Sequence, residues 1–125
     1  MSEKRLRGVV IPTITPMNED GSIDDGSLAD FTHFLAGAGV NALYPNGTNG
    51  ESLLLTKEER QHVAEVMAKA NERRLPLFIQ CGSMTTDETA SHAMHALKIG
   101  ADGIGVMSPA FFQMDEESLY QYYSD

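Results

Sequence analysis

The sequence is poor in cysteine and positive charge, lacks tryptophan, and has no long hydrophobic run. Its single cysteine, Cys81, excludes an internal disulfide and a zinc site built from several cysteines. Nine lysines and arginines stand against 18 aspartates and glutamates, so the net charge of −9 disfavours nucleic acid as a partner. The apolar run 9–14 is interrupted by Pro12 and is too short for a signal core or a membrane span. We therefore expect a cytoplasmic protein with no membrane contact.

The composition is that of a folded globular protein. Hydrophobic residues make up 42% of the chain and charged residues 22%, which separates it from disordered sequences. The sequence has 125 residues and contains no low-complexity stretch or linker, so we expect one domain over residues 1–125.

Short β-branched runs alternate with helical patterns along the whole chain. The predicted strands are 8–15, 41–45, 76–81 and 102–107. The helical patterns that follow them begin at N-cap candidates Asp24 or Ser27, Thr56, Thr85 and Asp115. The segment 57–60 is typical of a solvated first helical turn. This order predicts four βα units of about 30 residues with parallel strands and right-handed crossovers.

Two architectures accommodate four such units, and periodicity alone leaves both open. One is a doubly wound sheet, as in a flavodoxin-like binding or signalling domain, although neither Asp24 nor Asp25 follows a strand as an acidic phosphoacceptor pocket requires. The other is half of a (β/α)8 barrel, with helices on one side of the strands. A half-barrel leaves the inner strand face uncovered, so it should recruit a partner half, aggregate, or belong to a longer polypeptide.

The loop 46–52 is the strongest candidate for a binding site. It directly follows a predicted strand, and ligands bind at the carboxyl ends of parallel strands in both architectures. Gly47 and Gly50 permit left-handed or closely approaching backbone, and Thr48 and Asn49 add side-chain donors. Successive amide N–H groups in such a turn suit a small carboxylate. A polar turn without a ligand is the alternative.

Several motifs occur together in a fixed order. They are Val9–Pro16 (VVIPTITP), Asp20–Asp24 (DGSID), Gly47–Glu51 (GTNGE), Leu55–Arg60 (LTKEER), Gly100–Gly103 (GADG), and Ser108-Pro109 with Leu119-Tyr120. This ordered set resembles the N-terminal half of the dihydrodipicolinate synthase and N-acetylneuraminate lyase family. The resemblance favours the half-barrel, with four βα units of a TIM barrel.

The resemblance implies the chemistry of a class I aldolase. In that family a lysine forms a Schiff base with pyruvate or a related 2-oxo acid, a tyrosine relays protons, and no further cofactor takes part. Thr48 and Asn49 match the two side-chain positions of the carboxylate loop, and Asn49 argues against a hydroxyl relay because an amide is a poor proton shuttle. Phe111 stands where the family commonly has a tyrosine that reaches the neighbouring subunit's site, which implies a homo-oligomer.

No residue of this chain is expected to be catalytic, because the family's Schiff-base lysine and relay tyrosine lie on later strands, beyond Asp125. None of the lysines follows an apolar strand; they are Lys4, Lys57, Lys69 and Lys98. We therefore expect an inactive fragment of a carbon–carbon or carbon–oxygen lyase that carries the carboxylate loop. The alternative is a non-catalytic half-barrel that self-associates and at most binds a small carboxylate.

No metal site is expected in this sequence. His92 and His95 lie three residues apart on a predicted helix, but no third ligand has compatible spacing.

Overall fold

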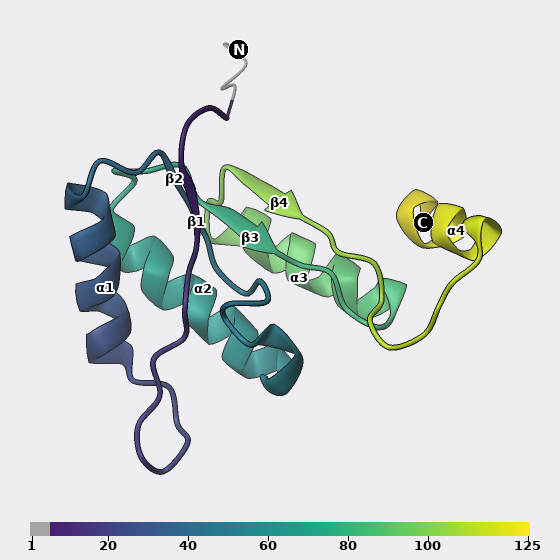
Figure 1. Cartoon of the computed structure of the whole chain (residues 1–125), viewed down its shortest axis with the longest axis horizontal. Helices are drawn as coiled ribbons and strands as arrows, with labels where there is room; N and C mark the ends of the chain where they lie inside the picture. The colour runs from purple at the N-terminus through teal and green to yellow at the C-terminus, as the bar shows by residue number, and fades with distance from the viewer. Residues whose placement is uncertain (1–5) are drawn as a thin grey trace.

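The computed structural model describes residues 6–125, so Lys4 lies outside the described residues. The elements are β1 (Val10–Pro12), α1 (Asp25–Gly37), β2 (Ala42–Tyr44), the 3-10 turn η1 (Ser52–Leu54), α2 (Lys57–Asn71), β3 (Phe78–Gln80), α3 (Thr86–Lys98), β4 (Gly103–Gly105) and α4 (Glu116–Ser124) (Figure 1). The four predicted βα units are confirmed, and each strand is shorter than the run that predicted it.

The strands run parallel and follow one another in chain order. β1 pairs with β2, with Val10 opposite Ala42, and β3 pairs with β4, with Phe78 opposite Gly103. A parallel bridge joins the two pairs through Leu43, whose N–H donates to Pro76 O at 3.0 Å. A doubly wound sheet reverses its strand order at a switch point, and this order has no reversal.

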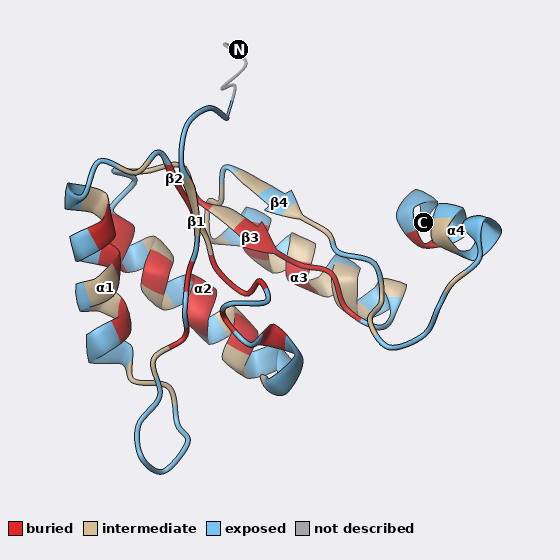
Figure 2. Cartoon of the chain, in the orientation of Figure 1, coloured by how far each residue is buried: buried red, intermediate tan, exposed pale blue. Residues whose placement is uncertain are grey.

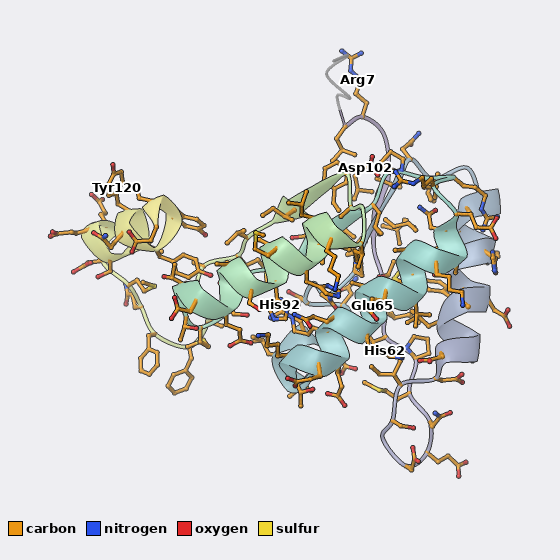
Figure 3. The ribbon with its side chains drawn as sticks, turned by 180° about the vertical axis from the view of Figure 1, so that it is seen from behind. Arg7, His62, Glu65, His92, Asp102 and Tyr120 are labelled. Carbon is orange, nitrogen blue, oxygen red and sulfur yellow. The ribbon has the colours of Figure 1, made fainter. Side chains whose placement is uncertain are left out.

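The first three helices cover one side of the strands. Figures 1 and 3 view the molecule from opposite sides, and both show α1, α2 and α3 on the same side of the strands. The buried residues gather between these helices and the strands (Figure 2). The core cluster is Leu28, Leu35, Leu43, Val63, Ala64, Met67, Leu77, Ile79, Cys81 and Ala96. Helices on one side are the arrangement of a (β/α)8 barrel.

The helix starts follow from their N-cap residues. Thr56 forms the full reciprocal capping box with Glu59, because each side chain accepts a hydrogen bond from the other residue's backbone N–H. Thr85 makes only the first half of this pattern, to the N–H of Glu88. Asp24 also caps its helix, accepting from the N–H of Ser27, and Asp115 caps α4 in the same way. The predicted helix starts are therefore confirmed.

Two glycines in β4 make room for aromatic side chains of β3, its neighbour, and of β2, the strand beyond it. An added Cβ at Gly103 would lie 2.6 Å from the Phe78 ring, and one at Gly105 would lie 2.2 Å from the Tyr44 hydroxyl oxygen. Both contacts are too close for any side chain, so β4 accepts these rings only because it carries glycine. Burial raises the pKa of Tyr44, with a smaller contribution from Cys81.

Within residues 6–125, no helix combines the length and the apolar character that crossing a membrane requires.

Candidate functional site

The predicted binding loop lies at the carboxyl end of β2, bounded by two residues with left-handed backbone. Asn46 has φ 62° and Glu51 has φ 55°. Gly47 and Gly50 do not have positive φ. The left-handed conformation expected at these glycines is instead adopted by the adjacent residues Asn46 and Glu51. Asparagine tolerates this conformation better than most residues, because its short side chain forms local hydrogen bonds.

Gly50 is required for a close approach to the end of β1. An added Cβ would lie 3.1 Å from Thr13 O and 3.3 Å from both Asn46 N and Thr15 Oγ1. The Thr15 hydroxyl donates to Gly50 O at 2.8 Å. The chain after β1 therefore supports the loop directly, and the predicted close approach is confirmed for Gly50.

The centre of the loop presents unused hydrogen-bond donors. Gly50 N–H donates to Gly47 O at 3.1 Å, and Glu51 N–H donates to Thr48 O at 3.0 Å. Among the residues that the structure describes, the N–H groups of Thr48 and Asn49 and the Thr48 hydroxyl donate to no other group. The Asn49 amide reaches Pro12 O only at 3.4 Å, and both side chains are exposed. Adjacent free N–H groups are suited to binding an anion.

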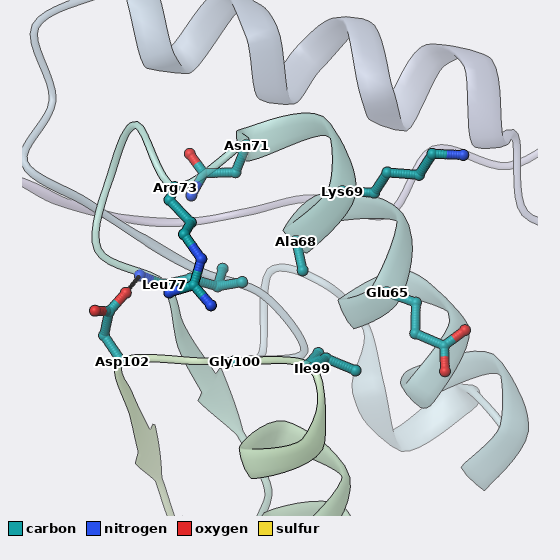
Figure 4. Close-up of a pocket in the computed structure, with 9 residues that line it drawn as sticks. All are labelled: Glu65, Ala68, Lys69, Asn71, Arg73, Leu77, Ile99, Gly100 and Asp102. Atoms are coloured by element: carbon teal, nitrogen blue, oxygen red, sulfur yellow. Dashed lines mark hydrogen bonds between the residues drawn. The ribbon is translucent and has the colours of Figure 1, made fainter.

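Two cavities lie at opposite ends of the strands. One of about 290 Å³ adjoins the loop; it is lined by Thr48, Glu51, Ser52, Leu53, Leu54 and Met107. The other, of about 280 Å³, lies at the amino ends of β3 and β4 (Figure 4). Its lining is Glu65, Ala68, Lys69, Asn71, Arg73, Leu77, Ile99, Gly100 and Asp102. In barrel enzymes only the carboxyl end carries the active site, which favours the first cavity.

Phe111 has the most strained backbone in the segment after β4. Its φ is 75°, an uncommon value for a bulky residue, and its side chain is 93% exposed. The ring packs edge-on against Phe112, with 5.0 Å between centroids. Such a conformation costs on the order of 1–3 kcal/mol and is typical of functional segments.

Arg60 is buried, which corrects the expectation of a solvated turn over 57–60. Only 4% of it is exposed, and its guanidinium donates to Gln80 O, Gly82 O and Ser83 Oγ at 2.9, 3.1 and 2.7 Å. Burial lowers its pKa. The first turn of α2 is amphipathic, and Arg60 lies on the side that faces β3. The sequence did not indicate this orientation, because a charged residue in the first turn of a helix is usually solvated.

Histidines on α3 lie in different environments. His92 is buried, and its Nε2 lies 3.6 Å from Glu88 Oε1, whereas His95 Nε2 lies 2.7 Å from Glu65 Oε1 on α2. Burial, together with the Arg60 charge, lowers the pKa of His92. Residues 6–125 contain no group of three or more histidine, cysteine or acidic side chains that could hold a metal ion.

The described lysines are exposed and belong to helices. Lys57 begins α2, Lys69 lies near its end, and Lys98 is the last residue of α3. None of them directly follows a strand.

Sequential parallel βα units with helices on one side, and a polar loop at the carboxyl end of β2, define a protein of the (β/α)8-barrel class. The family model of the Dihydrodipicolinate synthetase family matches residues 5–125, and the chain belongs to this family.

Relatives of known sequence and structure agree with this assignment. The chain is 35% identical over 119 residues to 4-hydroxy-tetrahydrodipicolinate synthase of Bartonella bacilliformis, covering 95% of this chain and 40% of that protein. It superposes on dihydrodipicolinate synthase from Aquifex aeolicus with a TM-score of 0.89 and 32% identity, covering 94% of this chain and 40% of the other. YagE from E. coli K12, solved in complex with pyruvate, gives 0.89 and 33%, with 94% and 39% covered.

The chain thus spans about 40% of the length of the relatives that it matches, and it corresponds to the N-terminal half of their barrel.

A methyl group at Gly50 should disturb the loop. We expect Gly50→Ala to lower the free energy of unfolding by about 1–3 kcal/mol, because the added Cβ meets the backbone of Thr13 and Asn46. The control is Gly37→Ala at the end of α1, where no atom lies within 4 Å and which should gain about 0.5 kcal/mol. Urea denaturation measures both. Equal effects of the two substitutions would contradict the proposed close approach.

The Cys81 thiol should give a pH dependence of stability. Burial raises its pKa from 9.0 to about 11, although the Arg60 charge acts in the opposite direction. Since the unfolded chain loses this proton first, the contribution of the thiol to stability is constant below pH 9 and falls between pH 9 and 11, by about 1.4 kcal/mol per unit. Cys81→Ala removes this slope. Parallel slopes for wild type and variant in urea denaturation would count against a buried neutral thiol.

Proposed function

We propose that this chain carries the carboxylate-binding half of a Schiff-base-forming lyase or aldolase that acts on pyruvate or a related 2-oxo acid. The free N–H groups of Thr48 and Asn49, with the Thr48 hydroxyl beside them, are the observation that carries the proposal. Their position at the carboxyl end of β2 is where barrel enzymes bind substrate. The pyruvate complex of the related YagE is consistent with the same ligand class.

The loop would hold the carboxylate, and a lysine elsewhere would react with the keto carbon. A fixed carboxylate pocket orients the keto group toward an amine, which removes much of the entropic barrier to imine formation. The iminium then withdraws electrons from the adjacent carbon, so a C–C or C–O bond next to it can break or form. Gly47 and Gly50 contribute the backbone geometry of the loop. Asn49 contributes an amide, and a proton relay at this position would need a hydroxyl group instead.

The lysines that the structure describes are unsuited to the nucleophilic role. A Schiff-base lysine needs a lowered pKa, which comes from burial or from a neighbouring cation. Lys57, Lys69 and Lys98 are exposed on helices instead. We therefore propose that the chain binds the 2-oxo acid without forming the imine. The reduced, buried Cys81 and the acidic composition fit a cytoplasmic protein without a nucleic acid partner.

Pyruvate titration tests this proposal. We expect pyruvate to shift the NMR amide signals of Thr48 and Asn49, whereas methyl pyruvate, which lacks the carboxylate, leaves them unchanged. Thr48→Val keeps the shape of the side chain but loses its hydroxyl, so affinity should fall about fivefold. Sodium borohydride added with pyruvate should leave the mass of the chain unchanged. Equal shifts from both ligands, or a reduced adduct on any lysine, would refute the proposal.

The exposed apolar residues favour a second property, self-association. Leu54 is 80% exposed and Phe111 is 93% exposed at the same end of the strands as the loop. Exposed apolar surface of this kind marks protein–protein contacts. We propose that the protein is a homo-oligomer in which Phe111 contacts the neighbouring copy. A half-barrel that only self-associates and binds a carboxylate would share this surface.

Sedimentation velocity tests the role of Phe111. Phe111→Gly removes the ring and relieves the positive φ, so association should weaken about tenfold while the monomer becomes more stable. Phe34→Ser removes an exposed ring from α1, where 68% of the residue is accessible, and should leave association unchanged. If Phe111→Gly associates as strongly as wild type, Phe111 is not at the interface.

A further inference from the structure

The Arg60 side chain connects α2 to the segment that leaves β3. Its Nη2 donates to Gln80 O and Gly82 O, and its Nη1 donates to Ser83 Oγ at 2.7 Å. Within residues 6–125 no carboxylate lies in salt-bridge distance of this guanidinium, so backbone and hydroxyl oxygens alone replace the lost hydration of its two Nη atoms, and its Nε has no partner among the described residues. A buried cation is costly, and its three hydrogen bonds hold the β3 exit in one geometry.

The main chain of Arg60 holds the other loop. Asn46 Nδ2 donates to Arg60 O at 2.9 Å, and this asparagine is only 2% exposed. Asn46 is also the residue with φ 62° that opens the loop 46–52. Its side chain and its backbone conformation therefore act together: the hydrogen bond to α2 determines where the loop begins, two residues before Thr48. One residue, Arg60, thus contacts the segments that follow β2 and β3.

A neighbouring hydroxyl network stabilises the same region but does not contact the loop. The Tyr122 hydroxyl donates to Ser83 O at 3.0 Å and accepts from Ser83 N at 3.2 Å. It also lies 2.7 Å from Thr89 Oγ1. These contacts attach α4 to the β3–α3 segment. Tyr122 therefore offers a matched control, because its loss removes buried hydrogen bonds beside Arg60 without touching Asn46.

We propose that Arg60 is a positioning residue for the carboxylate-binding loop, an inference that rests on the proposed function. Arg60 anchors α2 to the β3 exit through its guanidinium, and it orients Asn46 through its carbonyl. The free N–H groups of Thr48 and Asn49 then lie where a carboxylate can accept from both. Small displacements of such donors are expensive for binding, because a hydrogen bond weakens steeply with distance and angle.

Two variants test this assignment, one at the hydrogen bond between Asn46 and the Arg60 carbonyl and one at the hydrogen bonds between the Arg60 guanidinium and the β3 exit. Asn46→Gly removes the amide that donates to Arg60 O, yet glycine keeps φ 62° accessible, so the backbone conformation is not penalised. Arg60→Lys keeps the charge, but a single ammonium cannot reproduce the planar fork that meets three oxygens. We expect each variant to shift the NMR amide signals of Gly47 and Gly50 and to weaken pyruvate binding about tenfold.

Tyr122→Phe is the control for general destabilisation. It should lower the free energy of unfolding measured in urea, but pyruvate affinity should stay within about twofold of wild type. If Arg60→Lys fails to give a dispersed NMR spectrum, Asn46→Gly still tests the assignment, because it leaves the Arg60 guanidinium and its three hydrogen bonds in place.

The outcomes separate this inference from the proposed function. The positioning role would be overturned if Asn46→Gly kept the wild-type NMR amide signals of the loop and the wild-type affinity for pyruvate. The positioning role would also be overturned if Tyr122→Phe weakened pyruvate binding as much as Asn46→Gly does. A general loss of stability would then be enough to explain the weaker binding. If wild type binds no pyruvate, the proposed function fails, and the loop amide signals of Asn46→Gly and Tyr122→Phe alone decide whether Arg60 positions the loop.

Discussion

The parallel hydrogen bonding between successive strands is the constraint on which the rest of this structure depends. Because β1 to β4 run in the same direction and in chain order, every strand ends at the same edge. The loop after β2, the β3 exit and the segment that carries Phe111 are therefore brought together by topology alone. The crossover helices α1 to α3 must then lie on one side, where they bury one shared core.

The strands are short, so side-chain hydrogen bonds largely determine the geometry of the segments at their carboxyl ends. Each strand has 3 residues and can form only a few ladder hydrogen bonds. Beyond the ladder, Thr15 holds Gly50, Asn46 holds Arg60, and Arg60 holds the β3 exit. The hydrogen bonds of these buried groups favour one geometry, because any other would leave more donors without partners; Asn46 Oδ1 and Arg60 Nε already have none among the described residues. The loop 46–52 is thus held by hydrogen bonds to the segment after β1 and to α2, and Arg60 in turn links α2 to the β3 exit.

Local chemistry made much of this predictable. Thr56 with Glu59 and Asp115 with Ser118 satisfy helix N–H groups within four residues, so the sequence around them is enough. Arg60 shows the opposite case. Its position in the first turn of α2 suggests solvent, and only the packing of α2 against β3 turns it inward. Its partners lie about 20 residues away along the chain, a distance at which spacing rules carry no information.

The sequence by itself determined the four βα units, the helix starts and the place of a polar loop after the second strand, because these follow from periodicity, capping and turn chemistry within short windows. Periodicity left open whether the helices lie on one side, and the tertiary structure decided this; it alone decided that Asn46 and Glu51 take the left-handed backbone, and which donors stay free. Those features depend on contacts between distant segments, whose energies no local pattern contains.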